Sequence, residues 1–361
     1  MKRERSLVVA VLLGVAVAWW WFVTHPGGDL LPHGSVRITS VSSWKEPSRR
    51  PGSAPVEKIY FWTTQGDLLH LEQNVDGSTA VVRDRLTLFN TLQRDDAPPV
   101  QIPNGSLFLR PIPDGSGLLY GKTNTLRKNG FDVHLLDVNG KNDRPLSAFW
   151  VPNVAWMPDG KHWIASRFDA DYLNSLDGTP FRTLDTKSLS AWTPFVLGIT
   201  SQSRAISAGG SDQFEPPTPF QRGNSIRYPT AVLTEFDPAA PARSPKSWNV
   251  TMPPQSVRGK MMLSPQSDRI LWIVEKQSSG LSSWRSRLPF AYNRPYSGDE
   301  AIYVSQLNGT GMKQLFSAPT QRMRRGPTTM IKLPLTDIQW LPDGRRISFV
   351  YEDSLYVAPV D

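Results

Sequence analysis

Residues 338–349 read IQWLPDGRRISF, and this stretch decides the fold of the chain. Ile338 and Trp340 alternate with polar residues before the Pro-Asp-Gly, and Ile347 and Phe349 do so after it, which is the period-two pattern of pleated strands. Proline offers no N–H to a strand ladder, and Asp-Gly is typical of a tight hairpin turn. The stretch therefore predicts a strand, a turn and a second strand.

The same pattern recurs along the chain. Residues 154–164 (VAWMPDGKHWI) and 109–120 (LRPIPDGSGLLY) are close copies, whereas 262–272 (MLSPQSDRILW) and 199–206 (ITSQSRAI) are weaker ones. The proline or its counterpart falls at 113, 158, 201, 265 and 342, so the steps are 45, 43, 64 and 77 residues. The first two steps match the period of a four-stranded propeller blade, about 40–50 residues, and the longer two require insertions. Because one such repeat cannot bury its own sheet, we expect the repeats to stack around a ring.

Trp-x-Pro-Asp-Gly-Lys/Arg followed by an apolar strand resembles the WD40-like repeat of TolB-type β-propellers. The resemblance covers most of the chain after about residue 55 and implies an all-β fold. The repeats favour a six-bladed β-propeller, with five or seven blades as the alternatives. We expect Trp156 and Trp340 to be buried between neighbouring sheets. Related propellers serve as periplasmic scaffolds and as gating domains of prolyl-oligopeptidase-type enzymes, so the resemblance indicates a fold and leaves the function open.

The N-terminus has the pattern of a membrane anchor. Residues 1–5 carry three basic side chains, and Leu7–Val23 contains no charged residue. As a transmembrane helix, this segment would be about 25 Å long, and the basic cap would place the rest of the chain outside the cytoplasm. A cleaved signal peptide is the alternative, because residues 16–18 read AVA, but cleavage there would leave three tryptophans at the new terminus. We expect an uncleaved, single-pass anchor (1–23) in the cell membrane, with the propeller on the extracytoplasmic side.

The remaining chain divides into a tether and the propeller. Residues 24–56 are rich in Pro, Gly, Ser and Arg, which is typical of a tether. Within them, residues 36–41 alternate as a strand does, and we expect this strand to close the ring against the C-terminal blade. Residues 57–361 form the predicted propeller. Two of its blades carry long insertions, at Gly209–Gly223 and Gln277–Asp299.

Composition and motifs exclude several chemistries. The chain has no cysteine, which excludes disulfides, thiolate catalysis and cysteine metal sites. A Gly-x-Ser-x-Gly nucleophile elbow and Gly-rich phosphate loops are both missing from the sequence. The net charge of +8 is dispersed, which favours solubility over nucleic-acid binding. We therefore assign no catalytic residue, cofactor or metal, and we expect no nucleic-acid partner.

Other polar residues have structural explanations. His70 and His134 are expected in strands, and no two of the five histidines have metal-ligand spacing. The acids of 169–171 and Asp177 are interpreted as one solvated loop, with weak calcium binding as the alternative. The basic run 322–325 is expected in an exposed loop beside the membrane. The repeated acids of the Pro-Asp-Gly turns are assigned to turn formation.

Two function hypotheses follow. The first is a membrane-tethered binding scaffold for a protein, peptide or envelope polymer, in which the two insertions form part of the binding surface. Aromatic side chains there offer stiff contact area, and arginines offer planar hydrogen-bond donors. The candidate partner-binding residues are Phe214, Phe220, Arg222, Phe290, Tyr292, Arg294 and Tyr296. The second hypothesis is a propeller enzyme, a hydrolase or lyase acting on carbohydrate or peptide, with reactive groups from several blades converging at the central channel.

Overall fold

The computed structural model describes residues 31–41, 44, 60–74, 76, 78–124, 131–148, 154–167, 170–186, 195–209, 230–277, 295–325, 328–332 and 335–361. These residues form strands and turns, with no helix among them. None of the described residues belongs to an apolar helix of membrane-spanning length. The predicted anchor, residues 7–23, lies outside the described residues.

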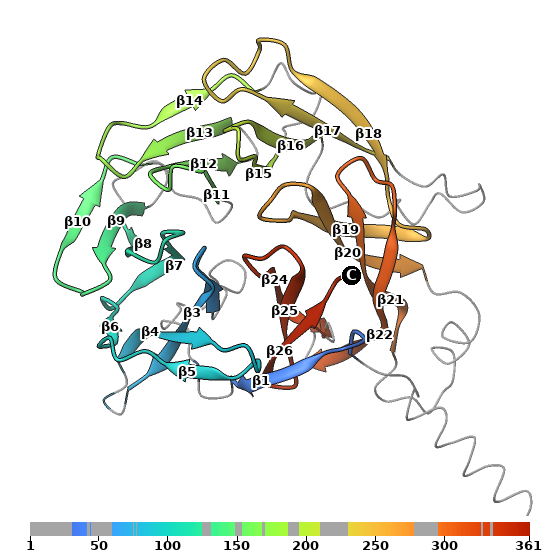
Figure 1. Cartoon of the computed structure of the whole chain (residues 1–361), viewed down its shortest axis with the longest axis horizontal. Coiled ribbons are helices and arrows are strands. Elements are labelled where there is room, and N and C mark those ends of the chain that lie inside the picture. The colour runs from blue at the N-terminus through green and yellow to red at the C-terminus, as the bar shows by residue number, and fades with distance from the viewer. Residues whose placement is uncertain are drawn as a thin grey trace, which may run out of the picture.

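Six antiparallel sheets stand around a common centre (Figure 1). Each sheet is a meander of four main strands, and β6 and β23 add a fifth strand to two of them. The prediction of an all-β propeller with six blades is therefore confirmed. Blades 1 to 6 begin with β2, β7, β11, β15, β19 and β24.

The strands fall into four positions within the blades. The first strands are β2 (Tyr60–Trp62), β7 (Ser106–Pro111), β11 (Val154–Trp156), β15 (Phe195–Ile199), β19 (Ser256–Leu263) and β24 (Thr336–Trp340). The second strands are β3 (Asp67–Gln73), β8 (Gly117–Thr123), β12 (His162–Arg167), β16 (Ala205–Gly209), β20 (Arg269–Gln277) and β25 (Arg346–Tyr351). The third strands are β4 (Thr79–Leu86), β9 (Phe131–Asp137), β13 (Ala170–Ser175), β17 (Thr230–Phe236), β21 (Pro295–Gln306) and β26 (Ser354–Pro359). The fourth strands are β5 (Leu92–Arg94), β10 (Asp143–Leu146), β14 (Arg182–Leu184), β18 (Lys246–Thr251), β22 (Lys313–Arg325) and β1 (Val36–Ser40). The additional strands are β6 (Val100–Gln101), which pairs with β4, and β23 (Thr328–Lys332), which pairs with β22.

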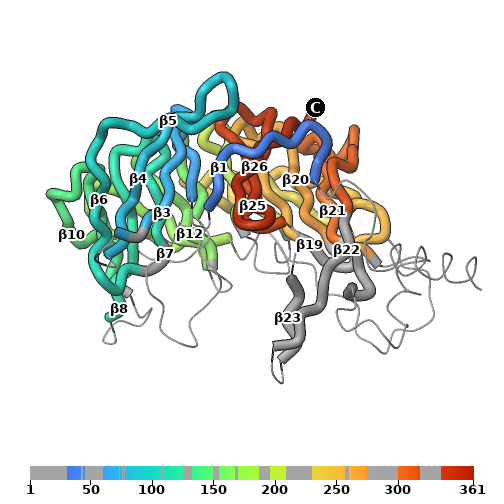
Figure 2. The backbone as a smooth tube through the Cα atoms, turned by 90° about the horizontal axis from the view of Figure 1, so that it is seen from below, coloured from blue at the N-terminus to red at the C-terminus, as the bar shows by residue number. Residues whose placement is uncertain are grey.

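An antiparallel meander gives the ring two distinct ends. Connections between first and second strands, and between third and fourth strands, lie at one end, which we call the turn face. Connections between second and third strands lie at the opposite end, which we call the insertion face because residues 210–229 and 278–294 belong to such connections. Figure 2 shows the ring from the side, with β1 and the C-terminus at the end that carries the turn face.

The sequence repeats occupy equivalent turns. In each blade the turn between the first two strands has the same pair of backbone hydrogen bonds, and one residue has a positive φ of 57–90°. The blade 1 turn, Thr63–Gly66, is a sixth copy that was not predicted, because only its glycine matches the repeated turn. The residues with positive φ are Gly66, Gly115, Gly160, Ser203, Ser267 and Gly344.

The repeated aspartates form these turns, as expected. Asp343 Oδ1 accepts the backbone N–H groups of Arg345 and Arg346 at 2.9 and 3.1 Å. Asp159 accepts the equivalent two N–H groups at 2.8 and 3.0 Å. A carboxylate in this position satisfies turn donors that have no partner in the strand ladder.

The hydrophobic core lies between the blades. Each of six buried clusters joins side chains of two neighbouring blades, including the cluster between blades 6 and 1. Trp340 is buried as predicted, at 7% exposure, in the cluster between blades 5 and 6. Trp156 is only half-buried, contrary to the prediction, because Trp163 of the next strand fills the interior. Trp156 packs against Trp163, with ring centroids 5.2 Å apart and ring planes tilted by 48°.

The N-terminal strand closes the ring, as the alternation of residues 36–41 predicted. β1 pairs with β26, from Val36 opposite Val357 to Ser40 opposite Ser354. The strand therefore starts at the turn face and ends at the insertion face. The last blade is thus built from both ends of the propeller, which protects a sheet edge that would otherwise be open.

Polar contacts join the two blades at the closure. The Tyr60 hydroxyl of blade 1 donates to the backbone carbonyl of Asp337 at 2.5 Å, and Trp62 Nε1 donates to Ser348 Oγ at 2.8 Å. The Gln339 side-chain amide donates to the Tyr60 carbonyl at 2.9 Å. These bonds link the first strand of blade 1 to the first two strands of blade 6 without any covalent crosslink.

Candidate functional site

Most of the predicted binding residues lie outside the described part of the chain. Six of the seven, all except Tyr296, fall in residues 210–229 or 278–294. Tyr296 belongs to β21, so residues 295–299 continue a strand where the sequence suggested a loop. The basic run 322–325 was also expected in a loop, but it is the end of β22 and pairs with β23.

The structure does describe the bases of both insertions. Gly209 is the last residue of β16 and pairs with Val232 of β17. Gln277 ends β20 and pairs with Gly298 of β21. Both insertions therefore leave the ring at the insertion face, and they do so from the neighbouring blades 4 and 5. The sequence indicated insertions in successive blades but did not show that they share one face.

A shared core supports these two bases. Ala208 and Ala231 beside the first insertion, and Val274 and Ala301 beside the second, belong to one buried cluster. All four are at most 2% exposed. Trp272 lies in the same cluster and is fully buried. The two insertions consequently start from a single packed platform.

Open clefts lie between blades at the turn face of the described chain. One, of about 770 Å³, lies between blades 4 and 5 and is lined by Glu235, Trp248 and Arg269 among others. Two of its charged residues have partners nearby: Glu235 bonds Arg204 at 2.8 Å, and Arg269 bonds Asp361 at 2.6 Å.

The second cleft, of about 440 Å³, lies where blades 6 and 1 meet. Trp62, Arg85 and Arg346 contribute to its lining. The β4–β5 hairpin stands beside it, and Arg346 Nη1 donates to Asn90 Oδ1 of that hairpin at 3.2 Å. The Arg85 side chain is 75% exposed, so its guanidinium is accessible from solution.

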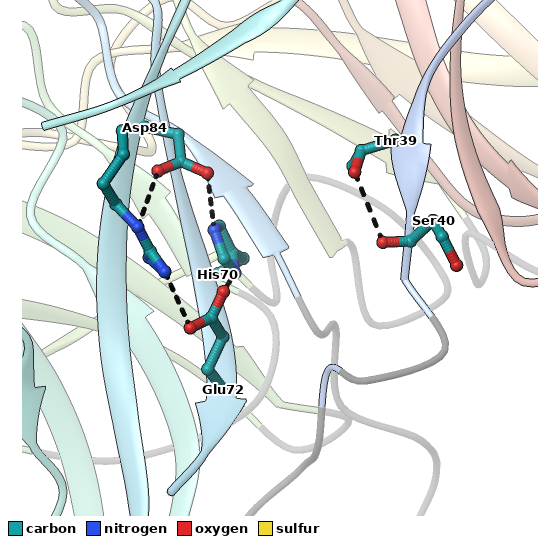
Figure 3. A network of polar contacts seen from close by, with 6 residues as sticks. Thr39, Ser40, His70, Glu72 and Asp84 are labelled. Carbon is teal, nitrogen blue, oxygen red and sulfur yellow. Dashed lines mark hydrogen bonds and ion pairs between the residues drawn. The ribbon is translucent and has the colours of Figure 1, made fainter.

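His70 is the buried end of a polar network in blade 1 (Figure 3). Its Nε2 lies 2.8 Å from Asp84 Oδ2, and Arg94 bonds Glu72 at 2.9 Å and approaches Asp84 at 3.7 Å. Trp44 stacks on the imidazole, with ring centroids 4.2 Å apart. His70 is only 2% exposed, which suits a structural strand residue, as predicted, and denies a substrate access.

The carboxylates around residue 170 do not form the solvated loop that the sequence suggested. Asp171 lies in β13 and is fully buried, whereas Asp177 is exposed in a turn. Asp169 lies outside the described residues. In the described chain, no three His, Asp or Glu side chains are grouped so that they could hold a metal ion.

Burial raises the pKa of Asp171 above its ordinary value of 3.8, and the nearby Ser166 and Thr186 hydroxyls oppose this rise only in part. Neither carboxylate oxygen has a hydrogen bond of good geometry. Because the folded state favours the protonated carboxyl, Asp171 contributes most to stability below pH 3.8, where it is protonated. This contribution is lost as the pH rises through the folded-state pKa. Asp171 therefore lowers stability at neutral pH.

We expect Asp171→Asn to increase the free energy of unfolding at neutral pH by about 1–2 kcal/mol, since it removes a buried charge without good partners. The gain should disappear as the pH approaches 3.8. Denaturant unfolding at neutral pH and in mild acid measures both effects.

Asp177→Asn is the matched control. Hydrogen bonds from Thr179 lower the pKa of Asp177 to about 2, so its charge stabilises the fold above pH 3.8 and this stabilisation is lost in acid. This variant should be slightly less stable at neutral pH. A gain of stability in both variants would contradict the assignment.

Comparison with known proteins found distant structural similarity and no match in sequence. No protein-family model matches the chain, and no curated protein matches its sequence significantly. Among solved structures, the β-propeller domain of the Trilobed protease from Pyrococcus furiosus is 9% identical and has a TM-score of 0.37, over 82% of this chain and 91% of that one. A prolyl endopeptidase is 11% identical with a TM-score of 0.40, over 90% of this chain and 48% of that one, so this chain spans about half its length. A eukaryotic initiation factor is 9% identical with a TM-score of 0.39, over 91% of this chain and 71% of that one.

The sheet topology alone defines the class: the described residues form an all-β, six-bladed propeller whose last blade is completed by an N-terminal strand.

Proposed function

We propose that the chain is a TolB-type propeller that is tethered to the cell membrane by Leu7–Val23 and serves as an extracytoplasmic binding scaffold. Its partner is a protein, a peptide or a cell-envelope polymer. One observation carries the proposal: both long insertions leave the same face of two neighbouring blades, from one buried cluster. Two loops that start side by side from a rigid base can form one continuous contact surface.

The residue types of the insertions suit recognition. Each contains aromatic side chains with prolines close by, and each contains at least one arginine. Aromatic rings bury much area with few rotatable bonds, and prolines restrict the conformations that the loop loses on binding. Tyrosine, tryptophan and arginine are also the residues that most often dominate binding energy at interfaces.

The position of the tether agrees with this use of the insertion face. The described chain begins at Leu31, and β1 starts at the turn face. A membrane anchor at residues 7–23 would therefore approach the ring from the end opposite the insertions. The insertions would then point away from the bilayer, where a partner in the periplasm or outside the cell can reach them.

The enzyme hypothesis remains the alternative, and it requires reactive groups from several blades to converge on one point. The scaffold is favoured because the bases of both insertions lie on one face of neighbouring blades, above one buried cluster. The double variant Phe290→Ala/Tyr292→Ala provides the test. We expect partner binding to fall more than about tenfold, the scale of an interface hot spot, while the melting temperature stays unchanged.

Binding should be measured on protein solubilised from membranes, by capture of the partner. Phe89→Ala is the matched control, because it removes an exposed aromatic ring from the turn face and should leave capture intact. Loss of stability in the double variant, with partner binding intact in the folded fraction, would mean that these aromatics only fasten the insertion to the ring. That result would contradict the proposed surface.

A further inference from the structure

We propose that the turn face rests on the lipid bilayer, with Leu88 and Phe89 inserted at the membrane–water interface. This inference rests on the anchor of the proposed function and adds an orientation and a second membrane contact. It concerns described residues only.

Leu88 and Phe89 are the most exposed large hydrophobic side chains of the described chain, at 100% and 87%. They form the tip of the β4–β5 hairpin, which projects at the end of the ring where β1 and the C-terminus lie (Figure 2). Two adjacent large hydrophobic residues at a protruding tip are unfavourable in water and favourable at the boundary of a bilayer.

The tip is a well-formed turn. The Thr87 N–H donates to the Thr91 carbonyl at 2.9 Å, and the Asn90 N–H donates to the Thr87 carbonyl at 3.0 Å. The two threonine hydroxyls share a further hydrogen bond of 2.7 Å. Asn90 takes a positive φ of 55°, which asparagine tolerates better than most residues. The backbone thus holds both hydrophobic side chains outward in a defined conformation.

The exposed hydrophobic residues share one side of the ring. Six large hydrophobic side chains are exposed among the described residues, and five of them lie at the turn face, either at a strand end or in a connection. Val232, in β17 near the insertion face, is the exception. The five are Val36, Leu88, Phe89, Val138 and Phe181. They come from four blades, and only Leu88 and Phe89 are adjacent, so the membrane contact is assigned to the hairpin tip.

The linker between the predicted anchor and the ring limits how far the turn face can lie from the membrane. Residues 24–30 separate the apolar segment from Leu31, and so short a linker spans at most about 30 Å when fully extended. β1 then starts at the turn face of blade 6, directly beside blade 1. Arg346 of blade 6 bonds Asn90 of the hairpin, so the β4–β5 tip stands next to the blade that the tether reaches. An anchor in the bilayer therefore keeps the tip within reach of lipid.

The polar surroundings of the tip suit phospholipid head groups. Arg85, at the end of β4 beside the hairpin tip, is 75% exposed and lies 3.7 Å from Asp67. Arginine beside an inserted hydrophobic residue can contact lipid phosphate while the apolar side chains reach the acyl boundary.

Site-directed spin labelling of the full-length chain tests the inference. The chain has no cysteine, so a single introduced cysteine is the only thiol available for a nitroxide label. The variants are Phe89→Cys at the tip, Thr251→Cys at the insertion-face end of β18, and Leu13→Cys in the predicted anchor. Each is reconstituted in vesicles of equal parts phosphatidylcholine and phosphatidylglycerol. Relaxation by oxygen, which concentrates in lipid, is compared with relaxation by a water-soluble nickel chelate.

We expect labels at positions 89 and 13 to be more accessible to oxygen than to the chelate, and the label at 251 to show the reverse. An aqueous label at 89 with a lipid-exposed label at 13 would overturn this inference and leave the anchor standing. An aqueous label at 13 would overturn both. A label at 89 that is shielded from both reagents would mean that protein covers the tip, which also overturns the inference. Leu88→Cys repeats the measurement at the neighbouring position.

Discussion

Trp272→Ala is expected to lower the free energy of unfolding by about 3–5 kcal/mol, the usual loss for a fully buried tryptophan. The ring is 0% exposed and lies in the cluster that joins blades 4 and 5. Its Nε1 donates to Ser305 Oγ at 2.9 Å, so the variant also leaves a buried hydroxyl with one partner fewer. Denaturant unfolding followed by circular dichroism measures the loss.

Val232→Ala is the control for this prediction. Val232 lies in β17 of blade 4 but is 39% exposed, and its truncation should change stability by less than about 0.5 kcal/mol. Because the cluster of Trp272 also supports the bases of both insertions, Trp272→Ala should increase amide exchange at the ends of β16 and β20. Equal losses in the two variants would contradict the view that the core lies between the blades.

Trp44→Ala is expected to destabilise the ring closure by about 3 kcal/mol. Trp44 is 8% exposed, stacks on His70 of blade 1 and belongs to the cluster between blades 6 and 1. The neighbouring Val41 N–H bonds the Asp353 carbonyl of blade 6 at 2.8 Å. This segment therefore connects the last blade to the first, and its loss should expose the β1–β26 pairing to solvent.

Hydrogen exchange measured by mass spectrometry locates that effect. Protection should fall first in β1 and β26, while blades 3 and 4 on the far side of the ring keep theirs. Val36→Ala, which shortens a 40%-exposed side chain in the same strand, should leave the pattern unchanged. A uniform loss of protection around the ring would show that the closure has no separate stability.

The sequence predicted those parts of the fold that depend on local patterns. Alternation around 338–349 and its copies located five of the six equivalent turns, since a hairpin is determined by its own strand and turn residues. The closing strand at 36–41 followed from its alternation and from the need to cover a sheet edge. The blade 1 turn at Thr63–Gly66 was missed because only its glycine and the flanking strands resemble the repeat.

Long-range packing accounts for what the sequence did not predict. Nothing near Trp44 indicates that it stacks on His70, because the contact forms only when the ring closes. Asp171 looked like a loop residue by composition, yet β12 and β14 enclose it in the centre of blade 3. Step lengths of 64 and 77 residues indicated two insertions, but only the strand register placed both on one face. The function proposed for the insertions rests on that placement.

Photo-crosslinking from the insertions tests the central claim most directly. A photoreactive phenylalanine analogue replaces Phe220 in the first insertion, Phe290 in the second, or Phe89 on the turn face, and intact cells are illuminated. If the two insertions form one binding surface, positions 220 and 290 will crosslink to the same partner, and position 89 will not. Different partners from 220 and 290, or a protein adduct from position 89 alone, would contradict the account.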